Sequence, residues 1–123
     1  MTEDQLEQET LAWLQEVGYT YRYGPDIAFD GSSPERADYR QVVLPFRLRE
    51  AINRLNPGIP VAAREDAIKQ VTDLGITSLL SANRAFHKML VGGVSVQYQK
   101  DGETRGDFVR LIDWSHPEKN EWW

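Results

Sequence analysis

The stretch VSVQYQKDGETRGDFVRLID, residues 94–113, decides the fold because its apolar side chains alternate with polar ones. Val94, Val96 and Tyr98 occupy every second position, and the same period returns after Asp101-Gly102. A period of two places alternate side chains on opposite faces of a strand, and Asp-Gly favours a tight turn between antiparallel strands. The sequence therefore predicts a β-hairpin over residues 94–113 with Asp101-Gly102 at its tip.

Helical periodicity precedes the hairpin. Apolar side chains recur three and four positions apart in four segments, and capping residues, Pro or Gly stand at the ends of these segments. The predicted helices cover residues 4–17, 45–55, 60–74 and 78–91. Three alternating tyrosines predict a short strand over residues 19–23, and the Gly-, Pro- and Ser-rich residues 24–35 predict a loop. The fold class is thus α+β, with four helices followed by an antiparallel β-hairpin.

Composition narrows the class of protein. A length of 123 residues with 41% hydrophobic and 27% charged residues fits one globular domain. No apolar run approaches the ~20 residues of a membrane span, and the acidic start MTEDQLEQET is not a signal peptide, so we expect a cytoplasmic protein. The absence of cysteine excludes disulfides, thiolate zinc sites and cysteine nucleophiles. A net charge of −5 excludes a wholly basic surface but leaves room for a local basic patch.

A search for catalytic motifs finds no phosphate-binding loop, nucleophile elbow or HExxH sequence, and His87 and His116 lie far apart in the chain. Pro25-Asp26 matches the start of a metal-dependent nuclease signature, which also needs an acidic residue two positions before a lysine. The residues at those positions are not acidic. They are Ala67, Phe86, Tyr98 and Pro117. We therefore interpret Pro25-Asp26 as a turn and predict no metal-binding residue in this chain.

Charged side chains give the remaining candidates. Arg47 and Arg54 share a face of the second predicted helix, and Arg84 and Lys88 lie one turn apart on the fourth. Such cations contact DNA phosphates without reading sequence, so these four are candidate DNA-phosphate contacts, with a solvated face of mixed charge as the alternative. Glu7 lies at the edge of the apolar stripe of the first helix, where it either faces a site or interface or stands in solvent.

Two long strings resemble the N-terminal segment of the R (restriction, or motor) subunit of type I restriction–modification enzymes. They are GPDIAFDG…SPERADYRQVVLPFRLREAINRLNPGIP and ANRAFHKMLVGGVSVQYQKDGETRGDFVRLIDWSHPEKNEW, and the resemblance runs from about Glu7 to Trp123. It implies the front part of a restriction-endonuclease-like nuclease domain. It also implies a large parent protein that cleaves unmodified double-stranded DNA with Mg²⁺ after ATP-driven translocation, together with methyltransferase and specificity subunits.

The same resemblance implies roles for few residues of this chain. Glu7 matches an acidic position on the first helix of the family, where a carboxylate supports the metal site, and Arg110 and Asp113 would support the sheet. The catalytic Asp and the Glu-x-Lys of the family come after Trp123. We therefore expect this chain to be inactive by itself, with Mg²⁺ and ATP needed only by the full-length protein.

A different class of function remains open from the sequence. Trp114, Trp122 and Trp123 would suit a free-standing protein-interaction module with no catalytic activity. A two-stranded hairpin is marginally stable alone, and a chain that stops on two tryptophans leaves large apolar side chains to be covered. We therefore expect the sheet to continue in sequence beyond Trp123.

Overall fold

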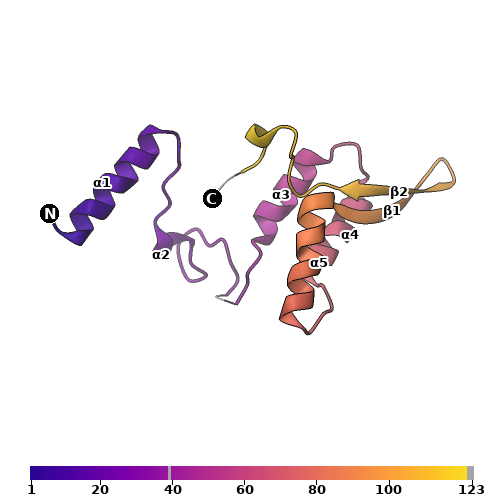
Figure 1. Ribbon diagram of the computed structural model, residues 1–123, viewed down its shortest axis with the longest axis horizontal. Coiled ribbons are helices and arrows are strands. Elements are labelled where there is room, and N and C mark those ends of the chain that lie inside the picture. The colour runs from indigo at the N-terminus through magenta and orange to yellow at the C-terminus, as the bar shows by residue number, and fades with distance from the viewer. Residues whose placement is uncertain (39, 122–123) are drawn as a thin grey trace. The chain divides into compact units, whose positions relative to one another are not determined.

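The computed structural model describes residues 1–38 and 40–121. Within them the chain forms five α-helices, two β-strands and a short 3₁₀ helix (Figure 1). In chain order these are α1 (Glu3–Glu16), α2 (Gly24–Ile27), α3 (Pro45–Leu55), α4 (Val61–Thr72), α5 (Leu79–Gly92), β1 (Val94–Lys100), β2 (Glu103–Val109) and η1 (Pro117–Lys119). The α+β class and the hairpin are confirmed, whereas the helix count is five rather than four.

The chain divides into two compact units, Met1–Val42 and Val43–Trp123. In the first unit, α1 begins with a capping box. Thr2 accepts a hydrogen bond from the backbone N–H of Gln5, and the Gln5 side chain accepts one from the Thr2 backbone N–H. The helix ends as predicted before Gly18, whose φ of 104° places it in the left-handed region that glycine tolerates.

Two predictions for the first unit are wrong. Residues 19–23 form no strand, although Tyr19, Tyr21 and Tyr23 alternate. A period of two stabilises a strand only where a neighbouring strand takes up its backbone hydrogen bonds, and in the described part of the chain β1 and β2 pair only with each other. The expected loop over residues 24–35 contains α2, because Pro25 at the start of that turn has the backbone angle of a helix.

In the second unit, residues that start or stop helices set the bounds of α3 and α5. Pro45 opens α3 and Asn56-Pro57-Gly58 closes it, so the observed bounds equal the predicted 45–55. Ser78 caps α5 by accepting a hydrogen bond from the Ser81 N–H at 3.5 Å, as predicted. Helix α4 stops at Thr72 rather than residue 74, because the Asp73 side chain accepts the Gly75 N–H (3.1 Å) in a local turn.

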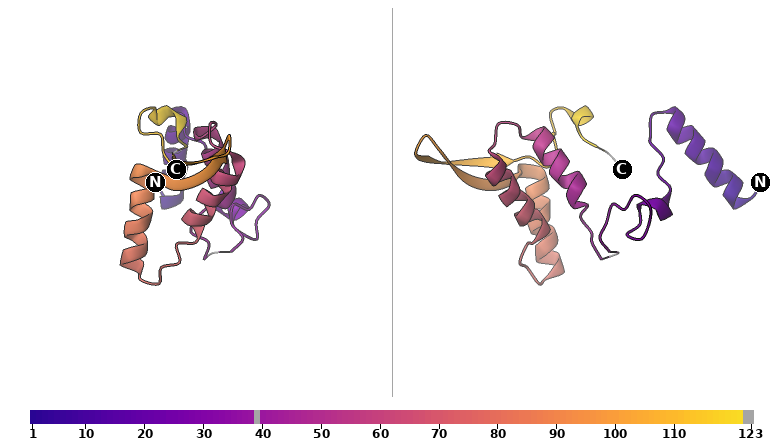
Figure 2. Two further views of the ribbon diagram at one scale, coloured as in Figure 1. Left: turned by 90° about the vertical axis from the view of Figure 1, so that its right-hand side faces the viewer. Right: turned by 180° about the vertical axis from the view of Figure 1, so that it is seen from behind.

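The hairpin pairs Val94 with Val109 and Lys100 with Glu103 in an antiparallel register. Asp101 (φ 55°) and Gly102 (φ 79°) form the tip, with the two positive φ angles of a type I′ turn. Strand β2 ends at Val109 and not at residue 113. Figures 1 and 2 show the hairpin extending beyond α3, α4 and α5, with its tip farthest from them.

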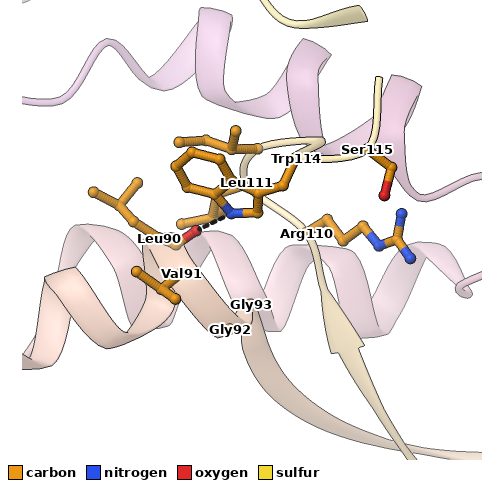
Figure 3. Close-up of a pocket in the computed structure, with 9 residues that line it drawn as sticks. Leu90, Val91, Gly92, Gly93, Arg110, Leu111, Trp114 and Ser115 are labelled. Atoms are coloured by element: carbon orange, nitrogen blue, oxygen red, sulfur yellow. Dashed lines mark hydrogen bonds between the residues drawn. The ribbon is translucent and has the colours of Figure 1, made fainter. Parts of the chain in front are cut away.

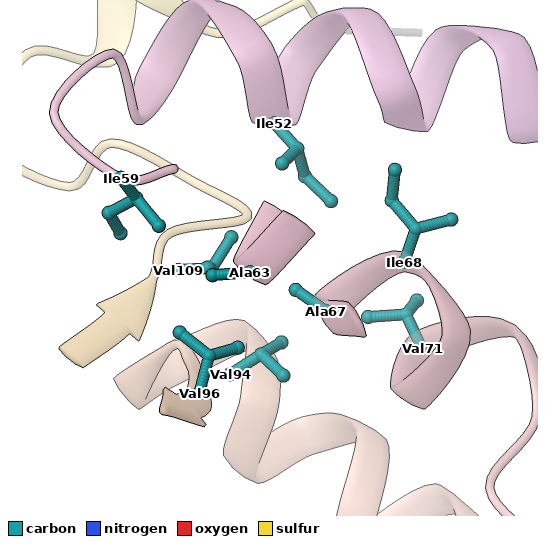
Figure 4. Packing of buried hydrophobic residues seen from close by; sticks show 9 residues of the cluster. All are labelled: Ile52, Ile59, Ala63, Ala67, Ile68, Val71, Val94, Val96 and Val109. Carbon is teal, nitrogen blue, oxygen red and sulfur yellow. The ribbon is translucent and has the colours of Figure 1, made fainter. Parts of the chain in front are cut away.

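The core lies where α3, α4 and one face of the hairpin meet (Figure 4). The inward face of α4 supplies four residues of the cluster, and Ile52 of α3, Ile59 of the loop before α4 and three hairpin valines complete it. The buried residues are Ile52, Ile59, Ala63, Ala67, Ile68, Val71, Val94, Val96 and Val109. Leu48, Phe86 and Met89 pack against them, so α5 also contributes to this core. The apolar side chains of α3 and its start are thus only partly buried, since Leu44, Leu48 and Leu55 keep some exposure.

Candidate functional site

The end of β2 is held by the side chain of Asn56, the residue that follows α3. Asn56, only 5% exposed, accepts the backbone N–H of Arg110 (2.7 Å) and donates to the Arg110 carbonyl (2.9 Å). Its amide also donates to the Ile52 carbonyl at 2.9 Å. The amide thus makes the two bonds that a neighbouring strand would make with Arg110. We call these bonds the Asn56 clasp. They explain why the predicted strand ends before Arg110.

The segment after the clasp, residues 110–121, is here called the C-terminal loop, and Asp113 organises it. One carboxylate oxygen of Asp113 accepts the backbone N–H groups of Ser115 (3.0 Å) and His116 (2.9 Å). The backbone of Asp113 pairs with the Asn120 amide, which accepts at 2.8 Å and donates at 2.9 Å. The N–H of His116, followed by that of Ser115, lowers the pKa of Asp113 below its usual value although partial burial opposes the shift. Asp113 is therefore a structural carboxylate.

Arg47 and Arg54, two of the four predicted phosphate contacts, bind the C-terminal loop. Arg47 forms an ion pair with Glu121, and the Arg54 Nε donates to the Lys119 carbonyl at 3.2 Å. Both arginines line a groove of about 220 Å³ between α3 and this loop. The structure thus brings these two candidates together, with their guanidinium groups engaged by their own chain.

Arg84 and Lys88 lie on exposed turns of α5, one turn apart as predicted. No carboxylate pairs with either cation within residues 1–38 and 40–121. Glu7 lies on α1, in the other unit, with its side chain exposed. Their roles in contacting DNA or supporting a metal site stay predictions.

The histidines and tryptophans were the other sequence candidates. His87 is exposed on α5, and the His116 Nδ1 lies 3.6 Å from an Asp113 oxygen. Trp114 is 60% exposed, and Trp122 and Trp123 lie outside the described residues. In the part of the chain that the structure describes, no three His, Cys, Asp or Glu side chains gather closely enough to hold a metal ion.

Sequence reasoning missed the Asn56 clasp and the hydrogen bonds that organise the C-terminal loop. The position of Asn56 before Pro57-Gly58 indicates the end of a helix, but an Asn side chain there does not reveal its distant partner. The only sequence signal for the loop was Asp113 followed by Ser115, a polar pair typical of side-chain-to-backbone turns.

Comparisons with known proteins agree on one family. The family model described as "Type I restriction enzyme R protein N terminus" matches residues 1–123. The "Type I restriction enzyme HindI endonuclease subunit" of Haemophilus influenzae is 39% identical over 116 residues, which is 94% of this chain and 11% of that protein. The "Putative type I restriction enzyme MjaIXP endonuclease subunit" of Methanocaldococcus jannaschii is 29% identical over 116 residues, with the same coverage of 94% and 11%.

The chain therefore spans about a tenth of the length of these curated relatives, 11% in both cases. No solved structure matches it significantly. Among the described residues, none of the helices combines the length and the apolar character that crossing a membrane requires.

Proposed function

The chain belongs to the family of type I restriction enzyme R protein N termini, and from this premise we propose that it is the supporting front part of a DNA-cleaving domain. The parent protein would cleave unmodified double-stranded DNA with Mg²⁺ after ATP-driven translocation. The single observation that carries the proposal is the match over residues 1–123, supported by the relative named as an endonuclease subunit at 39% identity. The partners proposed are double-stranded DNA and the methyltransferase and specificity subunits of a type I complex.

The described residues do not fit a Mg²⁺ ion, because no acidic or histidine cluster among them could hold one. We therefore assign Mg²⁺ and ATP to the full-length protein. The proposed contribution of this chain is structural. The Asn56 clasp and the Asp113–Asn120 bonds fix the course of the chain from β2 through the C-terminal loop.

For DNA contact we favour Arg84 and Lys88 over Arg47 and Arg54. An exposed cation with no carboxylate partner loses little when it meets a phosphate, whereas at Arg47 a phosphate would compete with the Glu121 carboxylate for the same guanidinium. Glu7 is proposed as the supporting carboxylate of the nuclease site.

The test of DNA contact uses the full-length protein, assembled with its partner subunits. Removing two phosphate contacts should lower the slope of log affinity against log salt by about 2. The variant is Arg84→Gln with Lys88→Gln, and the control is Lys69→Gln with Lys100→Gln, which removes two exposed cations from α4 and β1. Equal slopes for the two double variants would contradict the assignment.

The supporting role has its own test. The full chain described here, incubated with double-stranded DNA and Mg²⁺, should leave the DNA intact, and the assembled full-length protein should cleave it when ATP is added. Cleavage by the chain alone that EDTA abolishes would show that it holds a complete nuclease site.

A further inference from the structure

A notch of about 200 Å³ opens between the end of α5 and the start of the C-terminal loop (Figure 3). One wall is the last turn of α5 with Gly92 and Gly93, and the other includes Arg110, Trp114 and Ser115. The volume is below that of sites for drug-sized ligands, which start at about 300 Å³, and suits a small ligand with one planar ring system.

The indole end of the notch suits a flat ring. Trp114 is 60% exposed, yet its ring is oriented, because the indole N–H donates to the Leu90 carbonyl at 3.2 Å. Figure 3 shows the indole beside Leu90 and Val91. Since its only polar hydrogen is already bonded, what Trp114 offers a ligand is an aromatic face, on which a nucleobase stacks irrespective of its identity.

The backbone at this end presents acceptors. The Met89 carbonyl accepts the Gly93 N–H at 2.9 Å, and the Leu90 carbonyl accepts the Trp114 indole. The carbonyls of Val91 and Gly92 end α5 and have no helical N–H ahead of them. Carbonyl oxygens at the negative end of a helix dipole attract hydrogen-bond donors and repel anions. An exocyclic amine of a base fits there, and a phosphate does not.

The opposite end of the notch carries one cation, Arg110. In Figure 3 the Arg110 side chain extends away from the indole, and Ser115 lies on the same side of the notch. The Arg110 backbone is fixed by the Asn56 clasp, and the Ser115 N–H is fixed by Asp113 at 3.0 Å. No described carboxylate pairs with Arg110. A guanidinium and a hydroxyl that line the same notch suit a phosphate.

We infer that the notch binds one unpaired nucleotide, with its base against Trp114 and its phosphate at Arg110 and Ser115. The two ends of the notch match the two ends of a nucleotide, and its size excludes a stacked base pair. The inference rests on the proposed function, since a domain that acts on DNA meets unpaired nucleotides at strand ends and unwound sites. It adds to that function a contact that needs a base free of its partner strand.

The experiment compares two labelled DNA probes with equal numbers of phosphates, one a blunt duplex and one a duplex with a single-stranded overhang. Fluorescence anisotropy measures the binding of the full chain to each probe. The overhang probe should bind at least about fivefold more tightly, which is the lower end of the effect of stacking one base on an aromatic side chain. Equal affinities for the two probes would overturn the inference.

Substitutions locate the contact. Trp114→Leu should abolish the preference for the overhang. Trp114→Phe should retain most of it, because Phe keeps an aromatic face even though it loses the hydrogen bond to the Leu90 carbonyl. Trp13→Leu is the matched control, since Trp13 of α1 is also 60% exposed. A preference that survives Trp114→Leu, in a chain with unchanged circular dichroism, would refute the assignment of the base to Trp114.

The phosphate end is tested separately. Arg110→Gln should lower the salt slope for the overhang probe by about 1, and Arg105→Gln, an exposed position of β2, should not. Free dAMP as competitor identifies the source of the nucleotide. Displacement of the overhang probe at millimolar dAMP indicates a free mononucleotide, and the absence of displacement indicates a nucleotide within a strand.

The design separates the two proposals. Blunt-duplex binding that depends on Arg84 and Lys88 but shows no overhang preference would refute the notch and keep the DNA contact of α5. A chain and a full-length protein that bind neither probe would refute both.

Discussion

Replacing Asn56 with Ala tests whether the clasp sets the stability of the second unit. The substitution removes three hydrogen bonds, two to the Arg110 backbone and one to the Ile52 carbonyl, at 2.7–2.9 Å. Each such bond contributes roughly 0.5–1.5 kcal/mol net, so the loss should be about 1.5–4.5 kcal/mol. The Ile52 carbonyl keeps the Asn56 backbone N–H at 3.1 Å and Arg110 is exposed to water, which favours the lower half of that range.

The assay is urea unfolding followed by circular dichroism, with Asn53→Ala as the control. Asn53 lies one turn earlier on α3. Its backbone oxygen accepts a hydrogen bond from Arg64 at 3.5 Å, and its side chain makes no hydrogen bond to the described residues. Its replacement should change the free energy of unfolding by no more than ~0.5 kcal/mol. If the two variants unfold at the same urea concentration, the clasp does not stabilise the fold.

The stability of Asn56→Asp as a function of pH is a second test of the clasp. The introduced carboxylate would face the Ile52 and Arg110 carbonyls, to which the amide now donates, so the folded protein should raise the pKa of this Asp. A pKa that is higher in the folded state means that stability is full below the unfolded pKa and is lost as pH rises through the folded pKa. Asn56→Asp should therefore gain stability on acidification, where the protonated carboxyl can donate again. A variant whose stability does not change with pH relative to Asn56→Ala would show that these carbonyls are not its neighbours.

Three further predictions concern other residues. Asp113 has a lowered pKa, so its contribution to stability is present above the unfolded pKa and is lost as pH falls through the folded pKa; Asp113→Asn should flatten the fall of the urea midpoint below about pH 4. Gly93→Ala should lower the stability of the fold by about 1–3 kcal/mol, because φ at this position is +86° and a Cβ would lie 2.9 Å from the Val109 oxygen. Gly58→Ala is the control and should be nearly neutral, since its Cβ would meet no atom within 4 Å. Thermal unfolding measures both. Glu7→Gln should lower DNA cleavage by the full-length protein without changing its DNA affinity, and Glu9→Gln, also exposed on α1, should leave cleavage unchanged.

Local signals predicted most of the second unit. Pro45 and Asn56-Pro57-Gly58 bracket α3 because proline fixes φ at a helix start and cannot extend a helix. Asp101-Gly102 specified the hairpin tip because both residues adopt positive φ. Both signals act within a few residues of the chain, so they can be read from a single sequence.

The prediction of a strand over residues 19–23 was wrong because it rested on alternating tyrosines alone. The tyrosines there carry the period of a strand, yet a strand needs hydrogen bonds from another segment, and the sequence does not state whether one is within reach. The same limit hid the clasp, because Asn56 and Arg110 are 54 positions apart. Contacts of this kind depend on how α3 and the hairpin pack, which periodicity does not determine.

Arg47 and Arg54 show how packing changes the meaning of a basic cluster. From the sequence they were equal to Arg84 and Lys88 as phosphate contacts, but their partners lie 74 and 65 positions further along the chain. A guanidinium that holds the C-terminal loop already has part of its charge and donors engaged, so a phosphate at Arg47 would compete with Glu121 of that loop. Arg84 and Lys88 carry no such cost, because no described carboxylate holds them. The better candidates for DNA contact are thus the cations that the fold itself does not use.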